Sequence, residues 1–99
     1  MFLHITHVQH LQGYTLQLTF NSGVIKQVNL QDELDGEIFE PLRDLNVFRQ
    51  VSLDPDMRTI AWSNGADFAP EFLDEIGTPV QSQERQNMPS FSTMQPLPA

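Results

Sequence analysis

The stretch YTLQLTFNSGVIKQVNL, residues 14–30, predicts a β-hairpin from which the rest of the fold can be worked out. Apolar and polar side chains alternate along both halves, as expected for strands with one buried face. The apolar face is predicted to consist of Leu16, Leu18 and Phe20 on the first strand and Val24, Val28 and Leu30 on the second. Lys26 occupies the intervening position, and Gly23 suits the turn because glycine adopts positive φ without steric cost.

A third strand is predicted ahead of this hairpin, in the segment LHITHVQHL. Ile5 and Val8 are out of strict alternation there, so a β-bulge between them is needed to bring both side chains to one buried face. Gln12 and Gly13 then form the turn into the hairpin. The result is a three-stranded antiparallel meander.

The second half of the chain predicts one helix, a second hairpin and a final helix. PLRDLNVFRQ, residues 41–50, has apolar side chains at helical spacing, with a proline at the first helical position. VSL and TIAW then alternate around the loop DPDMR, in which Asp54 can accept hydrogen bonds from the backbone that follows. The last helix is expected to start at Pro70 and to end at Gly77.

This order, βββ-α-ββ-α, predicts the α+β class. We expect an antiparallel sheet of about five strands with the helices packed on one face or end. Residues 1–77 form the predicted compact domain. Residues 78–99 hold four of the seven prolines together with many Gln and Ser, and are predicted to be a flexible or partner-ordered tail.

Charge limits the classes of partner. The formal net charge is −8, and residues 32–75 carry twelve of the thirteen acidic side chains. An acidic chain is repelled by phosphate backbones and by anionic membrane surfaces, so we expect neither direct nucleic-acid binding nor membrane binding. The absence of cysteine excludes thiolate metal sites and cysteine nucleophiles. The N-terminal sequence does not resemble a signal peptide, and a cytoplasmic location is expected by default.

The segment WSNGADFAPEFLDE, residues 62–75, combines the only tryptophan with an Asn-Gly step. We predict that Trp62 covers the edge of the core, that Asn64 and Gly65 turn the chain at positive φ, and that Asp67 caps the last helix. The alternative is a small polar recognition site formed by Trp62, Asn64, Gly65 and Asp67.

Other chemistry is less well supported by the sequence. His4, His7 and His10 are the only histidines and are the candidate metal ligands, but on a strand their side chains do not converge. The acidic run from residue 32 to 37 lacks the ligand spacing of an EF-hand loop. No nucleophile elbow and no phosphate-binding glycine motif is present. We therefore predict a protein that is not an enzyme and needs no cofactor.

Several motifs together resemble a small bacterial domain-of-unknown-function family, number 2442, over about residues 2–76. They are Phe20 with Gly23, Phe39 to Leu42, Phe48 before Val51, and Trp62 to Asp67 followed by Pro70 and Glu71. The tryptophan, Asn-Gly and aspartate segment is the most specific of them. Asn21 and Ser22 depart from the Phe-x-Asp-Gly pattern that is frequent in the family.

The resemblance implies a compact α+β domain without an established catalytic site. Some family members carry an added helix-turn-helix domain, and others are encoded beside another small protein, in a layout similar to toxin–antitoxin pairs. Two hypotheses follow. The first is a non-enzymatic interaction module, an antitoxin-like or adaptor subunit that binds a small basic partner protein. Formation of a homodimer would add stability to so small a domain. The alternative is a small-ligand-binding or hydrolytic domain that uses residues 62–67.

Overall fold

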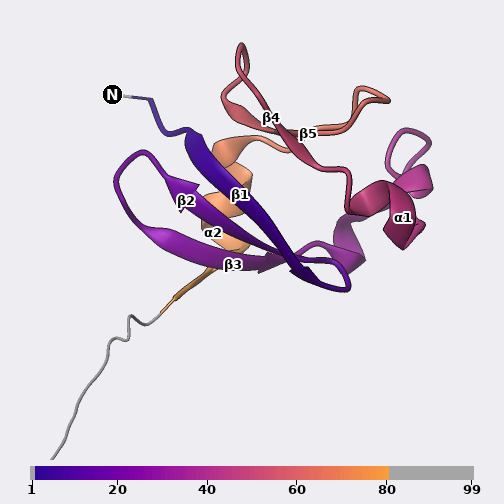
Figure 1. Ribbon diagram of the computed structural model, residues 1–99, viewed down its shortest axis with the longest axis horizontal. Coiled ribbons are helices and arrows are strands. Elements are labelled where there is room, and N and C mark those ends of the chain that lie inside the picture. The colour runs from indigo at the N-terminus through magenta and orange to yellow at the C-terminus, as the bar shows by residue number, and fades with distance from the viewer. Residues whose placement is uncertain (1, 81–99) are drawn as a thin grey trace, which may run out of the picture.

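The predicted hairpin forms the middle of a four-stranded antiparallel sheet in the computed structural model, which describes residues 2–80 (Figure 1). Strands β2 (Thr15–Phe20) and β3 (Ile25–Asn29) are joined by a turn in which Gly23 has φ +92°. Strand β1 (Ile5–Gln12) pairs with β2, and the two-residue strand β6 (Thr78–Pro79) pairs with β3. The order across the sheet is β1-β2-β3-β6.

The bulge predicted in β1 is confirmed. The register shifts between Ile5 and His7, so that Ile5 pairs with Phe20 while Val8 pairs with Leu18. Both β1 side chains therefore lie on the face that carries the buried residues of β2. A second register shift, between His10 and Gln12, was not apparent from the sequence.

The second hairpin does not join this sheet, so the single sheet of about five strands is replaced by sheets of four and two strands. Strands β4 (Ser52–Asp54) and β5 (Thr59–Ala61) pair only with each other within the described residues. The Ile5 amide N–H donates to the Arg58 carbonyl, with an N–O distance of 2.9 Å, and so links the hairpin to β1. This link lies at the bulge of β1, which begins at Ile5. A β-bulge bends its strand and interrupts regular pairing, so the hairpin meets β1 where the β1 ladder is irregular.

The helix predicted over residues 41–50 is broken in two. A 3₁₀ turn η2 (Glu40–Arg43) is followed by a short helix α1 (Leu45–Phe48), and an earlier 3₁₀ turn η1 (Gln31–Glu33) lies after β3. Asp44 separates η2 from α1 because its backbone is extended, with ψ 116°. Its carboxylate accepts a hydrogen bond from the Asn46 amide at 2.9 Å, which caps the new helix. Helix α2 (Pro70–Ile76) starts at the predicted proline.

The described structure continues for three residues beyond the predicted tail boundary at residue 77. Thr78 and Pro79 form β6 beside Gln27 and Lys26, so the ordered part continues past residue 77. The Val80 amide donates to the Ile25 carbonyl at 2.9 Å and extends this contact by one residue. The remainder of the predicted tail, residues 81–99, lies outside the described residues.

Helix α2 covers the core face of the four-stranded sheet and lies behind the strands in Figure 1. One buried cluster joins the sheet, the second hairpin and the helices. Its members are Ile5, Leu16, Leu18, Phe20, Val28, Leu30, Leu34, Leu42, Phe48, Ile60, Trp62, Ala66, Phe68 and Leu73. The four strands therefore have one buried face and one face that no other described element covers.

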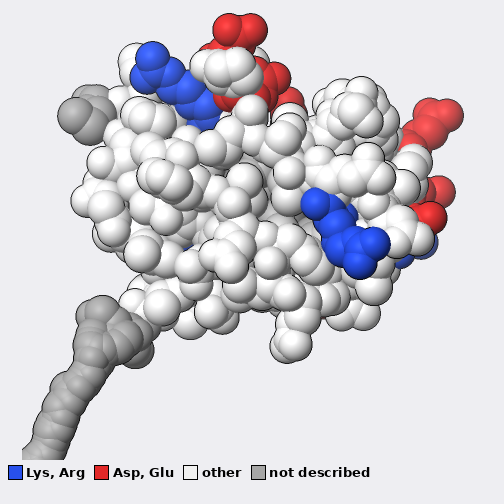
Figure 2. Space-filling view, in the orientation of Figure 1, with Lys and Arg blue, Asp and Glu red and all other residues white. Residues whose placement is uncertain are grey.

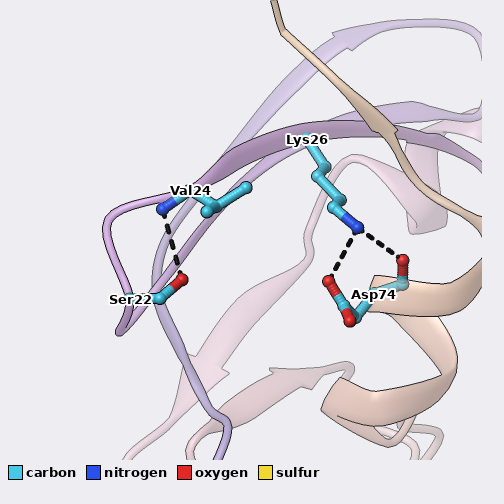
Figure 3. A network of polar contacts seen from close by, with 4 residues as sticks. All are labelled: Ser22, Val24, Lys26 and Asp74. Atoms are coloured by element: carbon cyan, nitrogen blue, oxygen red, sulfur yellow. Dashed lines mark hydrogen bonds and ion pairs between the residues drawn. The ribbon is translucent and has the colours of Figure 1, made fainter.

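Lys26, rather than Val24, completes the buried face of β3. Val24 lies at the hairpin end and is 44% exposed, whereas only 15% of the Lys26 side chain is exposed. The Lys26 Nζ donates to the Asp74 carbonyl at 2.8 Å and forms an ion pair with the Asp74 carboxylate at 2.7 Å (Figure 3). The lysine stem thus packs against the end of α2 while its ammonium group is bound by Asp74.

Gly77 follows α2 near the predicted helix end, but its φ of −75° is a conformation that any residue adopts, so no left-handed helix cap forms there. A side chain is excluded there by close packing. A Cβ atom at Gly77 would lie 2.9 Å from the Leu73 carbonyl oxygen and 3.1 Å from Lys26 Cβ and Cδ. The glycine lets the chain pass between α2 and β3 and continue into β6.

We expect Gly77→Ala to lower the free energy of unfolding by about 1–3 kcal/mol, because the added methyl group overpacks this contact. Urea unfolding followed by tryptophan fluorescence measures the change. Glu75→Ala, at an exposed position of the same helix, is the control and should shift stability by less than about 0.5 kcal/mol. A Gly77→Ala variant as stable as the wild type would contradict this account of the glycine.

Candidate functional site

Trp62 follows β5 and is a core residue, as its phase with Ile60 predicts. It is 4% exposed, and its indole Nε1–H donates to the Phe48 carbonyl at 2.9 Å. Its ring lies 5.6 Å from that of Phe48 and 6.0 Å from that of Phe68, measured between centroids. Neither the face nor the polar edge of the indole is left open for a ligand.

The Asn-Gly turn after Trp62 is closed by its own backbone. The Gly65 amide donates to the Trp62 carbonyl at 3.0 Å, and the Trp62 amide donates to the Ala66 carbonyl at 2.9 Å. Gly65 has φ +93°, as predicted, but the positive φ does not extend to Asn64. Glycine alone supplies the left-handed conformation that this turn needs.

Both ends of the Asn64 side chain are used. Its Oδ1 accepts from the Ala66 amide at 3.0 Å, and its Nδ2 donates to the Ile38 carbonyl at 2.9 Å. The first bond shapes the turn, and the second reaches a loop 26 residues earlier in the sequence. Asn64 is therefore a tether between two loops.

The predicted capping role of Asp67 is wrong. The N-cap of α2 is Ala69, which supplies no side-chain hydrogen bond, and Asp67 lies two residues earlier, where its backbone bridges to Ala61. The reason is the buried Phe68, which points into the core and separates Asp67 from the helix start. The Asp67 side chain is exposed and takes part in neither ion pair of residues 2–80.

The four predicted recognition residues thus share one turn, and three hollows of the described surface lie elsewhere. Trp62 is buried, Asn64 is bonded at both ends, Gly65 sets the backbone, and Asp67 points to solvent. The geometry favours a scaffold role for this turn.

The loop that Asn64 holds is part of residues 31–44, which we call the acidic segment. It contains six acidic side chains and one basic side chain. They are Asp32, Glu33, Asp35, Glu37, Glu40, Asp44 and, as the one base, Arg43. A hollow of about 380 Å³ opens on this segment, lined by Tyr14, Gln31, Asp32, Leu34, Asp35 and Arg43.

Contacts along its whole length fix the acidic segment. Leu34 and Leu42 are buried in the core, and the Phe39 ring stacks on Phe68 at a centroid distance of 4.9 Å. The Arg43 guanidinium donates to the Leu34 carbonyl at 2.9 Å and pairs with the Asp35 carboxylate at 2.8 Å. The Tyr14 hydroxyl donates to the Arg43 carbonyl.

The acids of this segment point outward. Asp32, Glu37 and Glu40 are exposed and make no ion pair with another described residue. Figure 2 shows acidic side chains at the end of the molecule where α1 lies in Figure 1. The exposed side chains of Ile38 and Leu45 lie in and beside the same segment. This end of the protein therefore presents acidic side chains, with basic ones beside them, mixed with apolar surface.

The three histidine side chains do not converge on one point. His7 lies on the opposite face of β1 from His10, whose ring packs edge-on against Phe48 at 6.0 Å. The His10 Nε2 is 2.8 Å from the Gly13 carbonyl oxygen, and His4 Nδ1 is 3.3 Å from the Phe2 carbonyl oxygen. Within residues 2–80 no three His, Asp or Glu side chains gather in a way that could hold a metal ion.

The sequence did not reveal the tether between Asn64 and Ile38, or the link between Tyr14 and Arg43. Both join residues far apart in the chain, and neither forms part of a local periodicity. The only sequence signals were the density of acids in residues 32–44 and the Asn-Gly step.

A family model described as "Protein of unknown function (DUF2442)" matches residues 5–76. Neither a curated protein nor a solved structure gives a match to the chain. In the described range, no helix is long and apolar enough to cross a membrane.

We expect Asn64→Asp to destabilise the protein by about 1–2 kcal/mol, because a carboxylate keeps the acceptor for Ala66 but loses the donor to Ile38. The variant should also speed amide hydrogen exchange in residues 36–40. Urea unfolding and exchange followed by mass spectrometry measure the two effects. Ser63→Ala, in the same turn, is the control. Unchanged exchange in residues 36–40 would show that Asn64 does not hold the acidic segment.

Proposed function

The chain belongs to the DUF2442 family of proteins of unknown function, and from this premise we propose that it is a non-enzymatic protein-interaction module. Its partner in this proposal is a small basic protein, which it binds as an antitoxin-like or adaptor subunit. The observation that carries the proposal is the acidic segment, whose exposed acids sit on a loop fixed by Asn64, Phe39 and Arg43.

A fixed loop supports binding because its conformational entropy is already lost in the free protein. An interface whose loops are ordered beforehand avoids the cost of immobilising them on association. The anchors of the acidic segment are buried or aromatic, whereas its acids are exposed. Binding therefore need not reorganise the core.

The chemistry of this end fits a basic protein surface. Asp32, Glu37 and Glu40 would attract lysine and arginine side chains, and opposite charges steer encounter and fix orientation. Ile38 and Leu45 offer apolar contact among those charges. An interface that combines apolar anchors with charged surroundings resembles known protein–protein contacts more than a small-ligand pocket.

The bonding of Trp62 and Asn64 supports the same choice over a ligand-binding or hydrolytic domain. The Trp62 indole N–H is bonded within the buried core, and both ends of the Asn64 amide bond to backbone groups, so these two side chains serve the fold. The proposal places the protein in the bacterial cytoplasm, where a basic partner encoded beside it would be made at the same time.

Affinity co-purification of the tagged full-length chain from its native cell, at low and at high salt, tests the proposal. We expect one stoichiometric small basic protein that is lost at high salt, because screening weakens exposed charge pairs. The purified partner is then titrated by calorimetry against the wild-type chain and against the double variant Glu37→Gln/Glu40→Gln. The dissociation constant should rise about tenfold or more, which corresponds to about 1.4 kcal/mol.

The matched control is Asp56→Asn/Glu75→Gln, which removes two exposed charges outside the acidic segment. It should change the dissociation constant by less than about twofold at equal ionic strength, because these charges lie away from the contact. Equal losses in both double variants would mean that only net charge matters, and would remove the acidic segment as the site. Failure to capture any basic protein would count against the proposed function as a whole.

A further inference from the structure

We propose that the open face of the four-stranded sheet is the contact surface of a homodimer, with a second copy of this chain as its occupant. The open face is the side away from α2. Strand register places on it His7, Gln9, Thr15, Gln17, Thr19, Ile25, Gln27, Asn29 and Thr78. No described element covers these side chains.

The open face contains no Asp, Glu, Lys or Arg, although the chain has a formal net charge of −8. Figure 2 shows the side of the sheet turned to the viewer, with α2 behind it, as largely uncharged atoms. In this view the acidic side chains lie at the α1 end and near the second hairpin, and those of α2 lie on the far side of the sheet. Charge is therefore segregated away from this side of the molecule.

This segregation is what a homodimer of an acidic protein requires. In a two-fold dimer the same patch of each copy faces its equivalent, so a charged patch would meet charge of the same sign. Two copies of a chain with net charge −8 repel each other, and they can approach with least repulsion through a surface that carries no charge. The neutral amide and hydroxyl side chains of the open face can bond to their own kind.

The shape of the open face is also complementary to itself. Its hairpin end is apolar: Ile25 is 38% exposed, Val24 is exposed beside it, and Val80 is held there by its bond to the Ile25 carbonyl. The opposite end is hollowed. Two hollows, of about 380 and 460 Å³, share Thr15 and Gln27.

Apolar side chains border both hollows: Ile76 lines the first and Leu11 the second. A two-fold axis that lies in the interface and runs across the strands would place the hairpin end of each copy over the hollowed end of the other. Ile25 and Val80 would then fill the hollow beside Thr15 and Gln27. One symmetry operation thus forms this contact twice, once at the apolar end of each copy.

The size of the face sets the expected strength. Strand spacing and rise give an area of roughly 20 by 25 Å, which is below the standard protein–protein interface. We therefore expect a reversible dimer with a dissociation constant on the order of micromolar. The acidic segment lies outside the open face, so this inference does not depend on the proposed partner.

Analytical ultracentrifugation of the purified full-length chain tests the inference. We expect a monomer–dimer equilibrium that high salt leaves unchanged or strengthens, because screening reduces repulsion between the two acidic copies. Gln17→Glu and Ile25→Glu should each raise the dissociation constant at least tenfold. Ser63→Glu adds the same charge in the Asn-Gly turn after β5, outside the open face, and should leave the dissociation constant within about twofold. Circular dichroism verifies that each variant is folded.

A chain that stays monomeric at millimolar concentration would overturn the inference. A dimer that Gln17→Glu and Ile25→Glu weaken no more than Ser63→Glu does would place the contact elsewhere and would also overturn it. A monomer whose β3 amides exchange faster once residues 81–99 are deleted would also overturn the inference. It would show that the chain's own C-terminal residues, and not a second copy, cover the open face. Salt strengthens this contact but weakens binding of a basic partner, so the two proposals can fail separately.

Discussion

The packing of Trp62 against Phe48 is the contact on which the rest of the structure depends. The indole fills the join between the second hairpin and α1, and its N–H binds the Phe48 carbonyl. Phe48 in turn packs edge-on against Tyr14 at 5.2 Å, which brings in the turn between β1 and β2. A domain of this size buries only a small core, so aromatic side chains with large contact areas supply much of its cohesion.

The same series of aromatic contacts extends to the other end of the core. Trp62 contacts Phe68, and Phe68 stacks on Phe72 of α2 at 5.8 Å and on Phe39 of the acidic segment. Phe68 must point inward for these contacts, which is why Asp67 lies outside the helix cap and faces solvent. The Thr59 hydroxyl donates to the Phe68 carbonyl at 2.5 Å and fixes this residue from the neighbouring strand. One network of rings therefore determines where the charged loops lie.

The arrangement separates two kinds of surface. The acidic segment is rigidly presented at one end, while the open face of the sheet is neutral with an apolar rim. The contacts proposed for these two surfaces are expected to respond oppositely to ionic strength, because attraction between unlike molecules and repulsion between like molecules are both screened by salt. Under the two proposals, self-association and binding of a partner of opposite charge use separate surfaces and do not compete.

The sequence by itself determined the features that local periodicity and turn chemistry control. These include the β2–β3 hairpin with Gly23, the bulge after Ile5, the start of α2 at Pro70, the α+β class and the family of the chain. Each depends on residues within a few positions of one another, where side-chain spacing and glycine conformation act directly. The burial of Trp62 was predictable for the same reason.

Only the tertiary structure decided the features that depend on distant residues. Lys26 is buried because Asp74 lies opposite it, and Asn64 is a tether because Ile38 lies within reach. The division into two sheets, the helix break at Asp44 and the pairing of β6 likewise follow from how the elements pack around the aromatic core. No local pattern encodes these contacts, because each requires two segments that come together only when the core forms.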